Sequence, residues 1–301
     1  MSGAGERSAT AAEAPIAVRS RFFAPPPEFE GCFTSFYRLE LDLPDGVTVS
    51  DCLQPEWGNI RFFCGALPWS QIEGRDAVVD ARFTATGPSS LPTHFTLGQV
   101  RMWGVGFLPL GWARLVDEDA SELANEVADG ERHAAFRKFA GLADILCDPA
   151  VSDQAQFDAI VETMRRLARH HRDEQTILKV HRALLDEELA SVGELAERAG
   201  LGLRRLERIC TRHFGFPPKL LMRRQRFMRS LTGFMLHKGS KWTEVIDEHY
   251  HDQAQFTREF RTFMGMAPSE YAALEHPILA SFVEARARIW GSPAQTLDRP
   301  R

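Results

Sequence analysis

The sequence predicts an α+β multidomain protein: an N-terminal antiparallel β-barrel or sandwich, a helical linker, and a C-terminal all-α domain with two helix-turn-helix units. Three observations support this fold class. Short alternating apolar runs, separated by Gly and Pro, occupy residues 16–115. Apolar residues recur at helical spacing through residues 116–172. Two similar helix-turn-helix patterns lie within residues 173–273, and residues 274–301 add a further helix and a tail.

The composition is that of an ordinary soluble protein with room for two cores. The chain has 301 residues, of which 44% are hydrophobic and 26% are charged. No apolar run approaches the roughly 20 residues of a membrane span, so no membrane partner is expected. Residues 1–15 are small and polar, lack the apolar stretch of a signal peptide, and are expected to form a disordered start.

Five cysteines are scattered through the chain, an odd number without any CxxC pair. This spacing argues against a disulfide framework or a zinc ribbon, and it favours a reducing compartment. The sequence therefore predicts a cytoplasmic protein. The cysteines are Cys32, Cys52, Cys64, Cys147 and Cys210.

Strand-like alternation begins at Phe33–Leu43, where apolar residues alternate with Arg38, Glu40 and Asp42. A Pro-Asp-Gly turn follows at residues 44–46. Many short strands at this spacing are typical of a small antiparallel barrel or sandwich. The further strands are predicted at 60–64, 77–86, 94–102 and 104–108.

Four tryptophans fall in this half, and they support two interpretations. Aromatic walls suit a pocket for an apolar small molecule, whereas Trp is also a common core residue. A metal-dependent barrel enzyme needs a cluster of His and carboxylates, but His94 is the one histidine before residue 133. Because there is no GxSxG-type elbow either, no catalytic residue, metal or cofactor is expected. The candidate pocket residues are Trp57, Trp69, Trp103 and Trp112.

Residues 116–172 are predicted to be helical. Apolar residues from Leu123 to Ile145 recur at three- and four-residue steps, and residues 154–170 form an amphipathic helix. Its apolar stripe packs either on the barrel or on a second copy of the protein. Three nearby histidines are expected on exposed helix ends, and not as metal ligands: His170, His171 and His181.

A helix-turn-helix pattern spans Ser191–Gly215. Ser191 and Glu194 form a capping box, and the stretch Gly200-Leu201-Gly202 ends the first helix where a positive φ costs little. The second helix extends from about Leu203 to His213. Its apolar arc is expected to face the first helix and consists of Leu203, Leu206, Ile209 and Cys210.

The opposite face of the second helix is basic. On a helical wheel it carries Arg204, Arg208 and Thr211, flanked by Arg205 and Arg212. Such a face suits the major groove of DNA, where Arg bonds guanine edges and phosphates. For a lone helix, a solvated charged face is the more common explanation of such a pattern.

The distribution of charge favours DNA. From Leu203 to Lys241 there are eleven Lys and Arg against Glu207 alone, a net charge of +10. Because the whole chain carries −5, the remainder carries −15. A compact basic stripe on an acidic protein is an electrostatic footprint for phosphate.

The helix-turn-helix pattern then repeats. A basic spacer helix at 219–231, about 20 Å long, leads to a second unit that is broken at 249–251. Asp252 and Gln255 form a second capping box. Two reading heads about 34 Å apart would enter successive major grooves on one side of a duplex. The outer face of the last helix, 253–264, carries Ala254, Gln255, Arg258 and Thr262, flanked by Arg261.

Residues 175–272 resemble the DNA-binding domain of the AraC/XylS family of bacterial transcription regulators. The resemblance rests on DQAQFTREFRTFMGMAPSEY, from Asp252 to Tyr271, and on the spacing and apolar positions of Ser191–Gly215. It implies that bases are contacted by Arg204, Glu207 and Arg208 of the first recognition helix and by Gln253, Ala254 and Arg258 of the second. The wheel adds Gln255. Phosphate contacts are predicted for Arg205, Thr211, Arg212, Arg224, Arg229 and Arg261.

One departure from the family pattern is His249, which stands where the family commonly has glycine at the turn. Histidine enters the left-handed region only at a cost, so the sequence leaves the angle of the second unit open. The resemblance also implies that the N-terminal half is a sensor domain. The helix at 277–290 lies outside the family domain, onto which it can dock back.

The sequence therefore predicts a sequence-specific DNA-binding transcription regulator that a ligand or a partner modulates at the N-terminal domain. The expected partners are double-stranded DNA, a small-molecule effector, RNA polymerase if the protein is an activator, and a second copy of the chain. One alternative is an N-terminal domain that only dimerises or contacts another protein. A second alternative, a β-barrel enzyme with a DNA-binding appendage, is disfavoured by the single histidine before residue 133.

Overall fold

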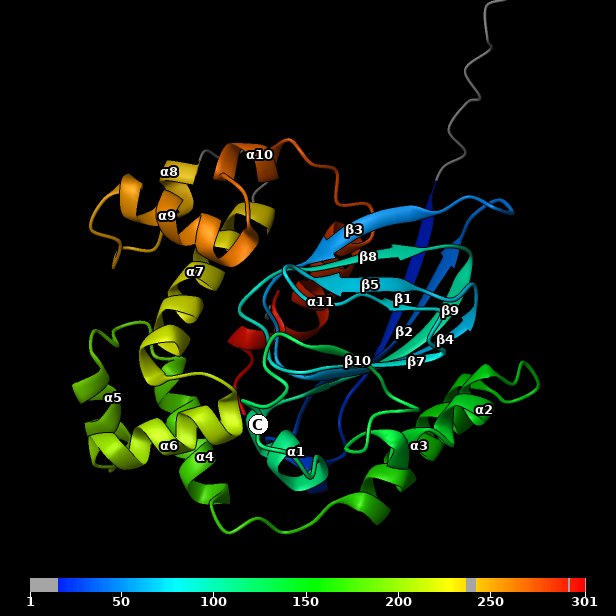
Figure 1. Ribbon diagram of the computed structural model, residues 1–301, viewed down its shortest axis with the longest axis horizontal. Coiled ribbons are helices and arrows are strands. Elements are labelled where there is room, and N and C mark those ends of the chain that lie inside the picture. Colours follow the sequence, from blue (N-terminus) through cyan, green and yellow to red (C-terminus); the bar gives the residue numbers. More distant parts are fainter. Residues whose placement is uncertain (1–15, 237–241, 292, 301) are drawn as a thin grey trace, which may run out of the picture.

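The computed structural model describes residues 16–236, 242–291 and 293–300, and it confirms the predicted fold class (Figure 1). The expectation of a disordered start at 1–15 lies outside the described residues, as do Lys238 and Lys241 of the basic stretch. Among the described helices, none combines the length and the apolar character that a membrane span requires.

The N-terminal half contains two antiparallel sheets. Apolar side chains such as Leu39, Phe63 and Phe95 come from both sheets and share one buried cluster, so the sheets pack face to face. The six-stranded sheet has the order β1 (Ala17–Phe23), β2 (Phe33–Asp42), β9 (Val100–Phe107), β4 (Asn59–Gly65), β7 (Phe83–Thr86) and β10 (Val127–Asp129). The four-stranded sheet has the order β3 (Val49–Leu53), β8 (Thr93–Leu97), β5 (Trp69–Ile72) and β6 (Val78–Val79).

Two of the predicted elements in this half are wrong. A strand break was predicted near Trp103, but β9 continues through it, and the turn instead lies at Gly98-Gln99. The apolar recurrence after Leu123 does not form one helix, because Val127–Asp129 pairs with β7 as an edge strand. A single buried Val with turns on either side satisfies a helical spacing by chance, and pairing with a distant strand decides its conformation.

The outer face of the six-stranded sheet is covered by helices of the linker. Helix α3 (Asp153–Leu167) begins at Ser152, whose side chain accepts a hydrogen bond from the Ala155 amide. Phe157 of α3 stacks on Phe23 with ring centres 4.9 Å apart, and Gln156 accepts a 2.7 Å hydrogen bond from the Trp103 indole. The apolar stripe of α3 therefore packs on the barrel of its own chain.

The remaining elements between the barrel and the all-α domain are short. They are α1 (Pro109–Leu115), the 3₁₀ turn Arg137–Phe139 and α2 (Leu142–Cys147). A disulfide joins Cys64 of β4 to Cys147 of α2 across 83 residues of sequence. The scattered cysteine spacing argued against disulfides and gave no sign of this bond, because only the packing of α2 on β4 brings the two residues together. Cys32, Cys52 and Cys210 are buried free thiols.

The all-α domain consists of two groups of helices at the ends of one long helix (Figure 1). The long helix α7 spans 19 residues and so extends about 28 Å, longer than the predicted spacer. The first group shares its buried cluster with the barrel, whereas the second group has a separate cluster that Cys52 of β3 joins. The helices are α4 (Glu174–Leu184), α5 (Val192–Ala199), α6 (Leu203–Phe214), α7 (Pro218–Leu236), α8 (Trp242–Val245), α9 (Gln253–Met264) and α10 (Pro268–Ala272).

The chain then returns to the barrel. Helix α11 (Leu279–Trp290) contacts β1 and β3 as well as α7, and the 3₁₀ turn η3 (Gln295–Leu297) also contacts α7. Figure 1 shows α11 between α7 and the sheets. The C-terminal helix therefore packs on the N-terminal domain as well as on α7, whereas the sequence suggested only docking back onto the DNA-binding-type domain.

Candidate nucleic-acid interface and barrel cavity

The first helix-turn-helix unit is capped as the sequence predicts. The Ser191 hydroxyl accepts a 3.1 Å hydrogen bond from the Glu194 amide, and the Glu194 carboxylate accepts one from the Ala190 amide. Gly200 ends α5 with a φ of +68°, a left-handed conformation that favours glycine. These local hydrogen bonds fix the turn, which sets the orientation of α6 relative to α5.

Helix α6 buries one face and exposes a basic face. Leu206, Ile209 and Cys210 are buried as expected, but Leu203 is 59% exposed. Leu203 is the first residue of α6, and a helical side chain covers the turn that precedes it, which is absent here. The exposed residues are Arg204, Arg205, Glu207 and Arg208, with Thr211 and Arg212 half-buried beside them.

Arg212 lies where α6 meets the N-terminal domain. Its Nε donates a 2.8 Å hydrogen bond to Asp119, and its carbonyl oxygen accepts a 2.7 Å hydrogen bond from the Ala120 amide. The predicted phosphate contact of Arg212 would therefore have to replace an existing ion pair. The contact also places the first recognition helix directly against the barrel domain.

The second unit is capped in the same way. Asp252 accepts a 2.6 Å hydrogen bond from the Gln255 amide, and the Gln255 side-chain oxygen accepts one from the His251 amide. Gln255 is thus engaged in the cap. Gln253, Ala254 and Arg258, which the family resemblance implies, are exposed on α9.

His249 does not adopt the left-handed conformation that its position at the turn suggested. Among the described residues other than glycine, positive φ values occur only at Asp80 and Asn125. His249 keeps an ordinary backbone because α8 ends early, and its amide and ring both hydrogen-bond to Asp247. The turn therefore needs no glycine at this position.

The predicted phosphate contact of Arg224 is also wrong. Arg224 is fully buried, with its guanidinium 3.9 Å from the ring centre of Trp57 and a 2.9 Å hydrogen bond from Nη1 to the Ser89 carbonyl. Burial lowers the pKa of Arg224 to about 9. The basic character of the spacer helix suggested a phosphate contact, but the Arg224 side chain packs on the barrel.

Other arginines of α7 hold the second unit in place. Arg223 and Arg226 both donate to the buried carboxylate of Glu259, and Arg229 donates to Asp247. Side chains from α7, α9 and the start of α5 line a cation-rich groove between the two units. Its charged and capping residues include Ser191, Lys219, Arg223, Arg226, Arg229, Arg258 and Glu259.

A second hollow lies inside the barrel, with a volume of about 80 Å³, which is room for several water molecules. Its apolar wall comes from both sheets and from α11, and its polar end contains Glu56, Arg61 and Arg286. The apolar lining includes Leu39, Leu53, Phe63, Phe95, Leu97, Ile278, Phe282 and Val283.

The four tryptophans were expected at a pocket. None of them is among the described residues that line this cavity. Trp57, Trp103 and Trp112 are core residues, each at most 2% exposed, and Trp69 is half-buried on β5. Alternation along β2 marked inward residues that do line it, Tyr37 and Leu39. The contribution of α11 could not be predicted from the sequence, because no sequence pattern near residue 280 indicates that this helix packs on the barrel.

The charges at the polar end of the cavity are paired. Arg61 donates 2.6 Å to Glu56, 3.1 Å to the Tyr37 hydroxyl and 3.2 Å to Thr86. Burial raises the pKa of Glu56, while Arg61 beside it pulls that pKa down. Arg286 donates to Ser35 and to Asp298. The cavity therefore contains two buried cations with two carboxylate partners.

His181 is not on an exposed helix end as expected, and burial between the Trp57 and Phe214 rings lowers its pKa to about 3. His171, another of the three histidines that were expected on exposed helix ends, lies with Asp173 and His213 in one cluster of potential metal ligands. The His213 Nε2 lies 3.9 Å from Asp173, and burial lowers the pKa of His213 to about 4.

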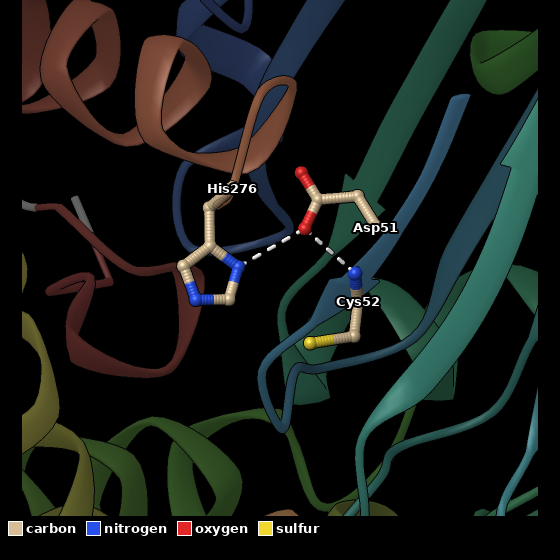
Figure 2. A group of neighbouring side chains, drawn as sticks. All are labelled: Asp51, Cys52 and His276. Carbon is tan, nitrogen blue, oxygen red and sulfur yellow. Dashed lines mark hydrogen bonds and ion pairs between the residues drawn. The ribbon is translucent and has the colours of Figure 1, made fainter. Parts of the chain in front are cut away.

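A second such cluster is shown in Figure 2 and contains Asp51, Cys52 and His276. The Asp51 carboxylate accepts hydrogen bonds from the Cys52 amide at 2.8 Å and from the His276 ring at 3.1 Å. Its second oxygen accepts the amides of Ile278 and Leu279 at 3.0 and 2.8 Å. Four donors saturate this carboxylate as a cap for α11, so it is a poor metal ligand.

Comparison with known proteins supports the interpretation of the all-α domain. Residues 195–273 match the family model of a helix-turn-helix domain. No curated protein matches the chain. Among solved structures, ToxT from Vibrio cholerae is 8% identical over 86% of this chain and 98% of that chain, with a TM-score of 0.45. Another ToxT structure, from strain O395, is 10% identical over 75% of this chain and 96% of that chain, with a TM-score of 0.41.

The AraC-like transcriptional activator CuxR is 17% identical over 71% of this chain and 86% of its own, with a TM-score of 0.24. Structural likeness at these values carries no argument about a ligand. The matched domain, by contrast, coincides with the two capped units around α7. The match therefore shows that residues 195–273 of this chain contain a helix-turn-helix domain.

Proposed function

We propose that the protein recognises an operator with both α6 and α9, each inserted into one of two successive major grooves. The observation that carries this proposal is the exposure pattern of the two helices. Arg204, Glu207 and Arg208 are exposed on α6, while the other face of that helix is buried. Arg258 is exposed in the same way on α9.

The chemistry of these side chains supports base reading. Arg forms paired hydrogen bonds with the O6 and N7 atoms of guanine, and Glu accepts from the cytosine amino group. Ala254 offers only a methyl contact, so the second unit is the less selective of the two. The cations that line the groove between the units supply phosphate contacts and hence most of the salt-dependent affinity.

Selection from a random duplex library tests the proposal. The full chain is expected to enrich two sequence blocks whose centres lie about 10–10.5 base pairs apart, with the stronger block under α6. The matched control is Arg166→Ala, which changes an exposed arginine on α3, outside the proposed interface. Equal retention of all sequences by the unmodified chain would refute sequence-specific reading.

We also propose that the barrel cavity binds a small uncharged effector. Apolar walls with a few converging polar groups are the usual make-up of a small-molecule site. The buried pairs Arg61–Glu56 and Arg286–Asp298 balance each other's charge. An ionic effector would bring an uncompensated charge into this cavity, which is costly.

Thermal unfolding with two probes of similar size tests the charge argument. Benzyl alcohol is expected to raise the melting temperature, because a ligand that binds only the folded state stabilises it, whereas benzoate is expected to have no such effect. An equal effect of benzoate would contradict an uncharged site. Contacts with RNA polymerase and with a second copy of the chain stay predictions.

A further inference from the structure

The chain beyond the matched domain closes the barrel. The family model ends at residue 273, yet α11 supplies one wall of the cavity with Ile278, Phe282 and Val283. The Phe282 ring lies 5.1 Å from the Phe22 ring and 4.8 Å from the Tyr37 ring, measured between centres. The described residues of segment 274–300 (274–291 and 293–300) are thus part of the N-terminal domain in space, although they follow the DNA-binding domain in sequence.

Asp51 anchors the start of this closing segment. The carboxylate on β3 accepts the Ile278 and Leu279 amides, which are the unpaired donors of the first turn of α11. It also pairs with His276 (Figure 2). A negative group at a helix N-terminus is stabilised by the helix dipole, so Asp51 holds α11 by charge as well as by hydrogen bonds.

The other end of the segment is anchored inside the barrel. Arg286 is 1% exposed and donates to Ser35 of β2 at 2.9 Å and to Asp298. The Asn59 side chain on β4 donates a 3.3 Å hydrogen bond to Gln295. Segment 274–300 is therefore held at both ends by buried polar contacts to three different strands.

The same segment contacts the helix that joins the two reading heads. The Gln225 side chain of α7 donates a 2.7 Å hydrogen bond to the Thr296 carbonyl, and this contact is buried. The adjacent Arg224 fixes α7 to the barrel through Trp57 and Ser89. Gln295 lines the cavity, so neighbouring residues of one turn contact both the cavity and α7.

We propose that segment 274–300 is the gate of the effector cavity and transmits its occupancy to α7. This inference rests on the proposed function, since it assumes a cavity ligand and operator binding. A ligand that pushes against Phe282 and Gln295 has different contacts in the closed and displaced states of the gate, which is the condition for shifting an equilibrium. Movement of Thr296 then changes how α7 is held, and with it the relative placement of α6 and α9.

Two variants of the full chain test the gate. Phe282→Leu and Asp51→Asn are expected to speed amide hydrogen exchange in α11 about tenfold and to change operator affinity about fivefold. Arg288→Ala changes an exposed residue of the same helix and is expected to alter neither. Faster exchange in α11 with unchanged operator affinity would overturn the proposal.

Gln225→Leu tests the link to α7 separately. With benzyl alcohol as the probe, the unmodified chain is expected to show altered exchange in α11 together with altered operator affinity. The Gln225→Leu chain is expected to keep the first response and lose the second. If both chains respond alike, Gln225 does not transmit the signal and the proposal fails, whereas absence of operator binding by the unmodified chain would refute the proposed function itself.

Discussion

The guanidinium of Arg224 lies 3.9 Å from the ring centre of Trp57, which joins the spacer helix of the DNA-binding domain to the barrel. The Arg224 side chain is fully buried, and the residue on which it stacks belongs to the other domain. A desolvated stacking of this kind contributes about 2 kcal/mol. The arginine of a basic block therefore acts here as an interdomain contact.

We expect Arg224→Ala to lower the free energy of unfolding by about 2–3 kcal/mol, because it removes the stacking and leaves a void beside Trp57. Urea unfolding measures this change. The salt dependence of operator binding is expected to stay that of the unmodified chain, because Arg224 reaches no phosphate. A flatter salt dependence would show that Arg224 contacts DNA after all.

Arg208→Ala is expected to weaken operator binding and to leave the stability of the fold nearly unchanged, the reverse of Arg224→Ala. The side chain is exposed on α6, so the free energy of unfolding should change by less than about 0.5 kcal/mol. Operator binding should weaken by about 1–3 kcal/mol, with relaxed base choice at the contacted position. Titration of the selected duplex and of single-base variants measures both effects, and unchanged binding would remove Arg208 from the set of reading residues.

The sequence predicts well those structural features that depend on residues close together in the chain. Both capping boxes, at Ser191 and Asp252, depend on a partner three residues away, and both are present. The contacts that the sequence did not predict join distant residues. Arg224 meets Ser89 across 135 residues, and His276 meets Asp51 across 225. Helical periodicity places a side chain on a face of its helix, but it does not say what that face contacts.

The cavity was missed for the same reason. The strands that form most of its wall were predicted, because alternation is a local pattern. The tryptophans were candidates for the wall because aromatic walls suit an apolar ligand, yet three of them belong to the buried core: Trp57, Trp103 and Trp112. The remaining wall of the cavity comes from α11. The spacing of its apolar residues predicted a helix, but it did not indicate that this helix packs on the barrel.

Reduction of the Cys64–Cys147 disulfide is expected to lower the free energy of unfolding by about 2–4 kcal/mol, because the bond closes a loop across 83 residues of sequence. Urea unfolding with and without dithiothreitol measures this. The Cys64→Ser, Cys147→Ser double variant is the control, and dithiothreitol should leave its stability unchanged. An equal effect of dithiothreitol on both chains would mean that the bond does not contribute to stability.

The buried histidines give the protein a defined sensitivity to acid. Burial lowers the pKa of His181 from 6.5 to about 3, so the folded state keeps it neutral while the unfolded state binds a proton as the pH falls below 6.5. The stability that this neutral ring contributes is complete above pH 6.5 and is lost as the pH falls towards 3. Each such histidine makes the free energy of unfolding fall by about 1.4 kcal/mol per pH unit in this window.

We expect His181→Phe, which keeps a ring between Trp57 and Phe214, to reduce the dependence of the free energy of unfolding on pH between pH 6 and pH 4 by that amount, as measured by urea unfolding. An unchanged slope would mean that His181 is protonated in the folded protein.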